Sequence, residues 1–362
     1  MTDPYPETNE AADPLIGSIL SDGWSISSRV TRHAKQSGGA FSYGYVATKN
    51  DQRAYVKAFD FEKVFKADDP MKELEKAVKS FNFERDLLSF CERSNIKRVV
   101  RAIGNGVIDN ANVPFGKLYY LLFELADADA RLHVVANDHG QVDWCLRSLH
   151  QIAAALQQLH SKGIYHQDLK PSNVLVFVND SASKLGDLGR AHYSGLEAPH
   201  DTSLVPGAWR YAAPELLYRA GMNDKDAQRA ASDLYLFGSM IFFFVMHIPV
   251  TPALMGTVQP EYRVALFGGS NLGLLFRDVL PFLTDAHADV LRIFKAKLCQ
   301  LLPGSEQIAD DVTDLLRYCT VPDPSLRGHP SARRMVNGNP YGLERFVSAF
   351  DVLATAVERR AR

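Results

Sequence analysis

The sequence is poor in cysteine, and its four cysteines are scattered along 362 residues. They are Cys91, Cys145, Cys299 and Cys319, and no two of them form a Cys-x-x-Cys pair. A small disulfide scaffold and a zinc site readable from spacing are therefore both excluded. Such sparse thiols suit a reducing compartment, so we expect a cytoplasmic protein.

Basic charge and long apolar runs are equally scarce. The 40 Lys and Arg are balanced by 42 Asp and Glu, and the net charge of −2 favours neither a nucleic-acid partner nor an acidic membrane surface. No Lys or Arg precedes Arg29, so the basic start of a secretory signal is missing. The richest apolar run, residues 234–250, is broken by glycine, serine, histidine and proline. We therefore expect no nucleic-acid partner and no membrane span.

Length and composition predict a globular chain of two domains or two lobes. At roughly 150 residues per domain, 362 residues exceed one ordinary domain, and 46% hydrophobic with 23% charged residues is typical of folded proteins. Residues 1–25 carry little periodicity and are expected to be loose. Strand-like patterns occupy residues 26–125, and helical patterns occupy residues 126–335. Residues 336–362 repeat apolar side chains at helical spacing, which predicts a helix packed on the large lobe, with a partner-binding helix as the alternative.

Local signals refine the first half of this layout. The runs Tyr43–Thr48 and Ala54–Phe59 are separated by turn-forming residues and predict a hairpin. Asp69 and Pro70 are suited to the N-cap and first position of a helix, which we expect to run to about Glu92.

The most specific segment is His166-Gln167-Asp168-Leu169-Lys170-Pro171-Ser172-Asn173, followed by Asp187-Leu188-Gly189. Six fixed positions in this spacing arise by accident roughly once in 10⁷–10⁸ registers, so a mere polar turn is a poor explanation. The arrangement resembles the catalytic loop and metal-binding motif of eukaryotic-like (Hanks-type) protein kinases. The resemblance covers roughly residues 27–335.

This resemblance implies an α+β, bilobal fold, with a small antiparallel-sheet lobe carrying one long helix and a larger, mainly helical lobe. It also implies ATP and Mg²⁺ as cofactors, with Mn²⁺ as an alternative metal, and a protein substrate. Asp168 would accept the proton of the attacking hydroxyl, and Lys170 would contact the γ-phosphate. Asn173 and Asp187 would hold the metal. The Asp-Leu-Lys-Pro form resembles Ser/Thr kinases more than tyrosine kinases.

Upstream, the phosphate-binding parts are less regular. Residues Gly39 to Val46 resemble the glycine-rich loop, with Gly44 expected in a tight turn and Val46 above adenine; a register with Phe41 at the tip is the alternative. Lys57 resembles the strand lysine that grips the α- and β-phosphates. Its expected partner is Glu84 on the long helix. The alternatives to Glu84 are Glu73, Glu75 and Glu92.

The segment after residue 120 resembles the hinge between lobes. Phe123 would be the gatekeeper, and the backbone of Glu124 and Ala126 would bond adenine. Downstream, the segment ending in Ala213-Pro214-Glu215 resembles the substrate-docking segment. The resemblance assigns a structural or docking role to His166, Gly189, Pro214, Glu215, Asp233 and Arg327, with a buried ion pair between Glu215 and Arg327.

Four departures from the family pattern qualify these expectations. Tyr55 replaces the usual alanine above adenine, Leu188 replaces the phenylalanine of Asp-Phe-Gly, and Ala208 replaces a threonine that often positions the catalytic residues. Gln167 replaces the arginine that commonly pairs with a phosphate on the activation segment, here residues 190–213. Because glutamine carries no charge, we expect phosphorylation of this segment to be unnecessary for basal activity.

The function that fits best is ATP- and Mg²⁺-dependent phosphoryl transfer to Ser/Thr hydroxyls of proteins, including its own. One alternative is a pseudokinase acting as a scaffold, but the presence of Lys57, Asp168, Asn173 and Asp187 argues against it. A small-molecule kinase sharing the catalytic loop is another, and the docking segment with Asp233 and Arg327 argues against that.

Overall fold

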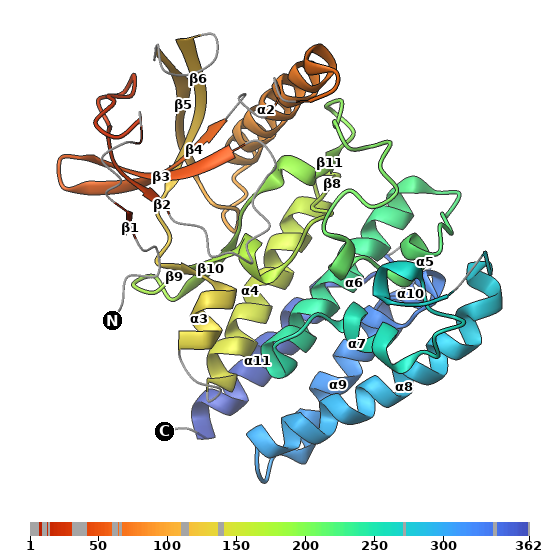
Figure 1. The fold of residues 1–362 in the computed structure, drawn as a ribbon. Helices are drawn as coiled ribbons and strands as arrows, with labels where there is room; N and C mark the ends of the chain where they lie inside the picture. Colours follow the sequence, from red (N-terminus) through yellow and green to blue (C-terminus); the bar gives the residue numbers. More distant parts are fainter. Residues whose placement is uncertain are drawn as a thin grey trace.

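The chain folds into a small lobe built on an antiparallel sheet and a larger, mainly helical lobe (Figure 1). This arrangement confirms the predicted α+β, bilobal fold class. The computed structural model describes residues 7–8, 13, 15–30, 42–59, 64, 67–109, 116–136, 141–270, 273–335 and 339–360.

Within the described residues, six strands form the sheet of the small lobe, in the order β1-β2-β3-β4-β6-β5, and all neighbours are antiparallel. The turn between β3 and β4 is Asn50-Asp51, with φ of 47° and 63°. Asn and Asp tolerate this left-handed region, and the two-residue turn gives the predicted hairpin. The strands are β1 (Glu7–Thr8), β2 (Ser25–Val30), β3 (Ser42–Lys49), β4 (Gln52–Phe59), β5 (Ala102–Asp109) and β6 (Lys117–Glu124).

The long helix of the small lobe is α2 (Pro70–Arg93), which lies beside the sheet (Figure 1). It begins as predicted, because the side chain of Asp69 accepts a hydrogen bond from Lys72 N at 3.1 Å and Pro70 stands at the first position. Its buried face includes Phe81, which contacts Phe59 of β4 edge-on at 4.9 Å between ring centroids. This contact fixes the helix against the sheet.

The start of the chain differs from the expectation of a loose segment. Leu15, Leu20 and Trp24 are buried with Ile26 and other sheet residues in one apolar cluster of the small lobe. The Oγ of Ser21 also lies 2.6 Å from the hydroxyl of Tyr120 on β6. Residues 15–25 are therefore part of the small lobe, because three spaced apolar side chains cover one face of its sheet.

The large lobe is organised around α6 (Lys225–Met246), against which the other long helices pack. By length and apolar composition α6 is the one described helix that could cross a membrane, but 89% of its apolar window is buried inside the protein. It is therefore a core helix. The other described α-helices of this lobe are α3 (Ala130–Ala136), α4 (Val142–His160), α5 (Pro214–Leu217), α7 (Val250–Thr257), α8 (Phe276–Leu301), α9 (Glu306–Thr320), α10 (Pro330–Arg333) and α11 (Leu343–Arg360).

The last helix, α11, lies along α4 (Figure 1), and one apolar face of it is buried. Phe346 and Phe350 are fully buried and meet Phe237 of α6 edge-on, at 6.0 and 5.7 Å. Arg147 of α4 pairs with Asp351 at 2.5 Å and with Glu358 at 2.9 Å. The C-terminal helix thus completes the core of the large lobe, as its pattern predicted.

Five short strands flank the catalytic loop and the turn at Asp187. One small sheet has the order β10-β9-β7, and a second pairs β11 with β8. Val100 N donates to Leu185 O at 2.8 Å, which joins the end of the small lobe to β10. These strands are β7 (Ala128–Asp129), β8 (Ile164–Tyr165), β9 (Val174–Phe177), β10 (Ala182–Leu185) and β11 (His192–Tyr193).

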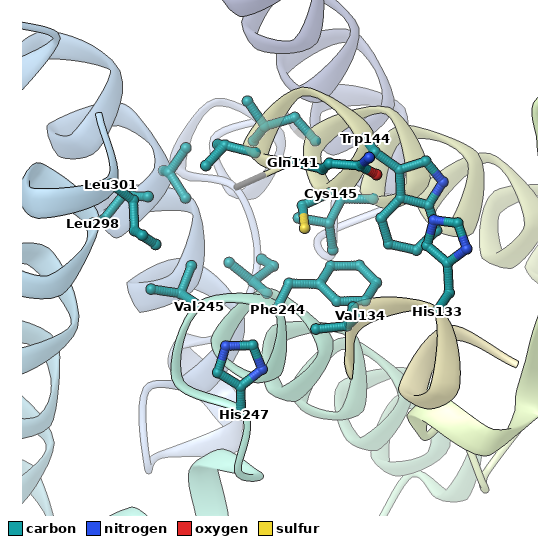
Figure 2. A pocket seen from close by; sticks show the side chains of 15 residues that line it. His133, Val134, Gln141, Trp144, Cys145, Phe244, Val245, His247, Leu298 and Leu301 are labelled. Atoms are coloured by element: carbon teal, nitrogen blue, oxygen red, sulfur yellow. The ribbon is translucent and has the colours of Figure 1, made fainter. Parts of the chain in front are cut away.

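An apolar cavity of about 40 Å³ lies in the large lobe between α3, α4, α6, α8 and α9. Figure 2 shows the ring of Trp144 beside His133 at one side, with Leu298 and Leu301 across the hollow. None of the predicted site residues lines it. Its size admits a few waters at most, so it is a packing defect between helices.

Candidate active site

The catalytic-loop residues lie between β8 and β9, and the loop is fastened to α6 by one carboxylate. Asp233 is fully buried and accepts hydrogen bonds from His166 N and Gln167 N, both at 2.7 Å, and from Gln167 Nε2 at 2.9 Å. His160 Nε2 of α4 lies 2.8 Å from the same carboxylate. The helix that forms the lobe's core therefore also fixes the loop.

Asp168 is held from three sides. Its Oδ2 lies 2.6 Å from Lys170 Nζ and accepts from Asn173 Nδ2 at 3.2 Å. Its Oδ1 accepts from Ala208 N at 2.9 Å. The sequence offered no signal for this last bond, which comes from the backbone and so survives the missing threonine hydroxyl at position 208.

The close approach behind the Ala208 bond depends on Gly207. A Cβ at residue 207 would lie 2.4 Å from Gln167 O and 2.7 Å from Asp168 Oδ1. Only glycine allows the docking segment to come this near the catalytic loop. No local pattern in the sequence shows that position 207 requires glycine, because the residues it approaches are about 40 positions away.

The turn that carries Asn173 is hydrogen-bonded to Gly186, the residue directly before Asp187. Asn173 Nδ2 donates to the carbonyl of Asp168 at 2.9 Å, and Gly186 N donates to Asn173 O at 2.8 Å. His166 Nε2 lies 3.2 Å from Gly186 O, which joins the loop to the following motif. Asp187 has a left-handed φ of 56°, a strained backbone of the kind that clusters at functional sites.

The predicted ion pair between Lys57 and Glu84 is present. Lys57 Nζ lies 2.7 Å and 2.8 Å from the two oxygens of Glu84 and 3.0 Å from Asp187 Oδ1. Glu84, and none of the three alternative glutamates, is therefore the partner of Lys57. A Cβ at Gly189 would come within 3.3 Å of Glu84 Oε2, so glycine keeps room for α2 to approach.

Burial and charge act in opposite directions on this triad. Burial lowers the pKa of Lys57, but the carboxylates of Asp187 and Glu84 outweigh it and leave that pKa raised. Lys57 holds the pKa of Asp187 well below its usual range, against the effect of burial. Burial raises the pKa of Glu84, partly offset by Lys57. Asp187 is thus an anion and Lys57 a cation at neutral pH.

The face of the sheet above this triad differs from the expectation in one respect. Gly44 lies inside β3, paired with Lys57, and not in a tight turn. A Cβ there would lie 2.5 Å from the hydroxyl oxygen of Tyr55, so the glycine makes room for that ring. Tyr55 pairs across the strands with Val46 on one side and Phe123 on the other, and its ring centroid lies 6.4 Å from that of Phe123.

Of the predicted hinge residues, Phe123 and Glu124 end β6, and Ala126 follows two positions later. Phe123 and Ala126 are buried, and the side chain of Glu124 pairs with Lys184 of β10 at 2.7 Å and accepts from Arg101 N at 2.7 Å. The hinge is thereby held by both lobes. The prediction for Gly39 falls outside the described residues.

The docking segment is anchored by the predicted buried ion pair. Arg327 Nη1 and Nη2 donate to the two oxygens of Glu215 at 2.7 and 2.6 Å, and both side chains are at most 1% exposed. Pro214 begins α5, directly before Glu215. The pair joins the start of α5 to the loop after α9.

The amino-acid sequence matches the model of a known family over most of the chain. The protein kinase domain family matches residues 38–339. The chain belongs to the protein kinase family.

Curated relatives of this kinase include mitogen-activated protein kinases of plants. It is 29% identical to mitogen-activated protein kinase homolog MMK2 of Medicago sativa over 212 residues, 58% of this chain and 53% of the relative. It is 30% identical to mitogen-activated protein kinase 4 of Arabidopsis thaliana, over 58% of this chain and 52% of the relative. The match thus spans about half the length of these relatives. It reaches 39% identity with mitogen-activated protein kinase 4 of Oryza sativa subsp. japonica, but over only 98 residues.

Proposed function

We propose that this kinase transfers the γ-phosphoryl group of ATP to Ser or Thr hydroxyls of protein substrates, its own included. The observation that carries the proposal is the convergence of Lys57, the buried Glu84 and the partly exposed Asp187 in one ionic cluster. The cluster joins the sheet, α2 and the start of the activation segment, which is the alignment that phosphoryl transfer requires. Asp168 and Asn173 are joined to it by the bonds around Gly186.

The residues present fit a divalent metal. Since Asn173 Nδ2 donates to Asp168 O, the amide oxygen of Asn173 is turned away from that bond, and Asp187 is ionised. An amide oxygen and a carboxylate are hard ligands suited to Mg²⁺, with Mn²⁺ as an alternative. A bound Mg²⁺ would offset the charge of the β- and γ-phosphates.

The chain's own groups supply the remaining roles. Asp168 is oriented by Lys170, Asn173 and Ala208 N, which leaves its carboxylate placed to accept the proton of an incoming hydroxyl. Lys170 lies beside it as the cation for the transferred group. Lys57 orients the α- and β-phosphates, and Glu84 keeps Lys57 in place. Val46, Phe123, Glu124 and Ala126 would enclose adenine.

One observation favours a second candidate, a scaffold with weak nucleotide binding. The ring of Tyr55 lies against Gly44, between Val46 and Phe123, where the family has a small side chain. The two candidates differ in a direct measurement of ATP affinity. If Tyr55→Ala were needed for any ATP binding, the scaffold would be the better description.

The deciding experiment is phosphoryl transfer from labelled ATP and Mg²⁺ to a generic protein substrate. We expect incorporation by the wild-type protein, on serine and threonine, and a loss of at least about 100-fold in Asp168→Asn. Equal incorporation by both proteins would refute the assignment of Asp168. We further propose a cytoplasmic location, supported by four cysteines that are all described and free.

A further inference from the structure

Asp201, in the middle of the activation segment, bridges His192 near the start of that segment and Arg229 of the large-lobe helix α6. Asp201 Oδ1 lies 2.6 Å from His192 Nδ1 and 3.3 Å from Arg229 Nη2. His192 belongs to β11, which pairs with Tyr165 of β8 just before the catalytic loop, and Arg229 belongs to α6. Asp201 thus connects the middle of the segment both to α6 and to the segment's own β11 strand, which is paired with β8.

Arg229 is itself in contact with the catalytic loop. Its carbonyl oxygen accepts from Gln167 Nε2 at 3.0 Å, and Gln167 also donates to Asp233 Oδ1. Gln167 directly precedes Asp168, and its left-handed φ of 60° shows how tightly the neighbouring contacts hold it. A single residue, Arg229, therefore separates Asp201 from the loop that carries Asp168.

The charges around this contact are arranged differently from the pattern expected for arginine at position 167. Gln167 is neutral, and its Nε2 donates to two oxygens of α6. The nearby cations are Arg229 and, when protonated, His192, and the carboxylate they share belongs to the segment itself. Arg190, another basic residue of the activation segment, donates from Nη1 to His200 Nδ1 at 2.7 Å.

We propose that Asp201 is a positioning residue: its carboxylate holds the activation segment on the catalytic loop through His192 and Arg229, so that the segment needs no phosphate to be ordered. The proposal rests on the proposed kinase function and specifies how that site is regulated. It also explains how Gln167 can stand where a cation is expected.

The expected size of the effect follows from exposure. The side chains of His192, Arg229 and Asp201 are 12%, 20% and 35% exposed, so their interactions are partly screened by water. A half-exposed ion pair changes an equilibrium constant by up to about fivefold. Two such pairs give an expected loss of about tenfold on removal of the carboxylate.

The chain offers a matched control in Asp226. Its Oδ1 lies 2.9 Å from Arg229 Nη1 and 3.9 Å from His192 Nε2, but Asp226 sits on α6 and not in the activation segment. Asp226→Asn therefore removes an equal charge beside Arg229 and His192 but leaves the contacts of Asp201 in place. The conservative variant Asp201→Glu keeps the charge.

The experiment combines turnover with hydrogen exchange of residues 192–203 in the full chain. For Asp201→Asn we expect exchange in this segment to rise about tenfold and kcat to fall about tenfold, with the KM for ATP unchanged. Asp201→Glu should recover most of both effects, and Asp226→Asn should stay within twofold of wild type. Phosphatase treatment of the wild-type protein should change neither readout.

Two results would overturn the proposal. One is equal behaviour of Asp201→Asn and Asp226→Asn in exchange. The other is a loss of activity in phosphatase-treated wild type as large as that of Asp201→Asn. Hydrogen exchange reports on Asp201 even if the wild-type protein transfers no phosphate, so failure of the kinase assignment is seen separately, as absent turnover with the exchange effect intact.

Discussion

The buried pair between Glu215 and Arg327 gives the sharpest test of how the large lobe is held together. The residues are 112 positions apart, and the guanidinium makes two bonds to the carboxylate. Arg327 also donates to the carbonyls of Val321, Pro322 and Ala231 at 3.0, 3.1 and 3.3 Å. Every nitrogen of the guanidinium thus has a protein acceptor, and the ion is excluded from water.

Removing only the charge of Glu215 leaves the buried Arg327 cation without its ionic partner. For Glu215→Gln we expect a loss of about 3–5 kcal/mol in the free energy of unfolding, because an unpaired buried ion keeps its desolvation cost. For a unit the size of the large lobe, each kcal/mol lowers the melting temperature by about 2–4 °C, so we expect a fall of roughly 10 °C. The exposed pair of Asp314 and Arg317, at 2.9 Å, is the control, and Asp314→Asn should cost less than about 0.5 kcal/mol.

The assay is thermal or urea unfolding of a double-mutant cycle with Arg327→Met. Once one partner is gone, removing the other should cost far less, so the two single losses should exceed the double loss by at least about 2 kcal/mol. Additivity within about 0.5 kcal/mol would refute the reasoning. A Glu215→Gln variant as stable as Asp314→Asn would do the same.

Three further predictions concern other parts of the molecule. Lys57→Met should lower kcat/KM by at least about 100-fold while circular dichroism shows an intact fold; near-normal turnover would show that Lys57 does not orient phosphate. Phe350→Ala should lower the free energy of unfolding by about 3–5 kcal/mol and Val352→Ala on the same helix, 68% exposed, by less than about 0.5; equal effects would mean that α11 does not pack on the lobe. Burial, together with the charges of Arg327 and Arg317, lowers the pKa of His287 to about 4. Between pH 6.5 and pH 4, His287 is therefore protonated in the unfolded chain and neutral in the folded protein. Stability should therefore fall by about 2 kcal/mol from pH 7 to 5, and His287→Gln should flatten that part of the profile in pH-dependent unfolding; an unchanged profile would contradict it.

The parts of the fold and site that the sequence predicted share a physical basis. The pattern 43–59 and the cap at Asp69 depend on neighbours in the chain, and both occur as expected. The catalytic-loop motif is contiguous because one carboxylate, one cation and one amide must meet within a few ångströms. Glu84 could be selected by its position between apolar residues of α2, although its partner is 27 residues away.

Other features depend on contacts that leave no local pattern. Residues 15–25 look loose because glycine and polar residues interrupt their apolar side chains, yet Leu15, Leu20 and Trp24 are buried in the apolar cluster on one face of the sheet. The resemblance to the glycine-rich loop places Gly44 in a tight turn, whereas the glycine is required by the size of Tyr55 on the neighbouring strand. Composition and periodicity cannot show either requirement, since both depend on which strand lies next to which.

The regulation of the site shows the same limit most clearly. From the sequence, Gln167 indicates only that a charge is missing, and Arg190 and Arg210 are the nearest candidates to replace it. In the structure Arg190 donates to His200, and the carboxylate of Asp201 meets His192 of β11 and Arg229 of α6, which lies 28 residues beyond Asp201. The absence of a positive charge at position 167 can therefore be seen in the sequence. Which groups hold the activation segment instead depends on β11 and α6, which meet only in the folded protein. This is why the motif predicts the chemistry of the loop, while the means of holding the activation segment must be found by examining the contacts of its own side chains.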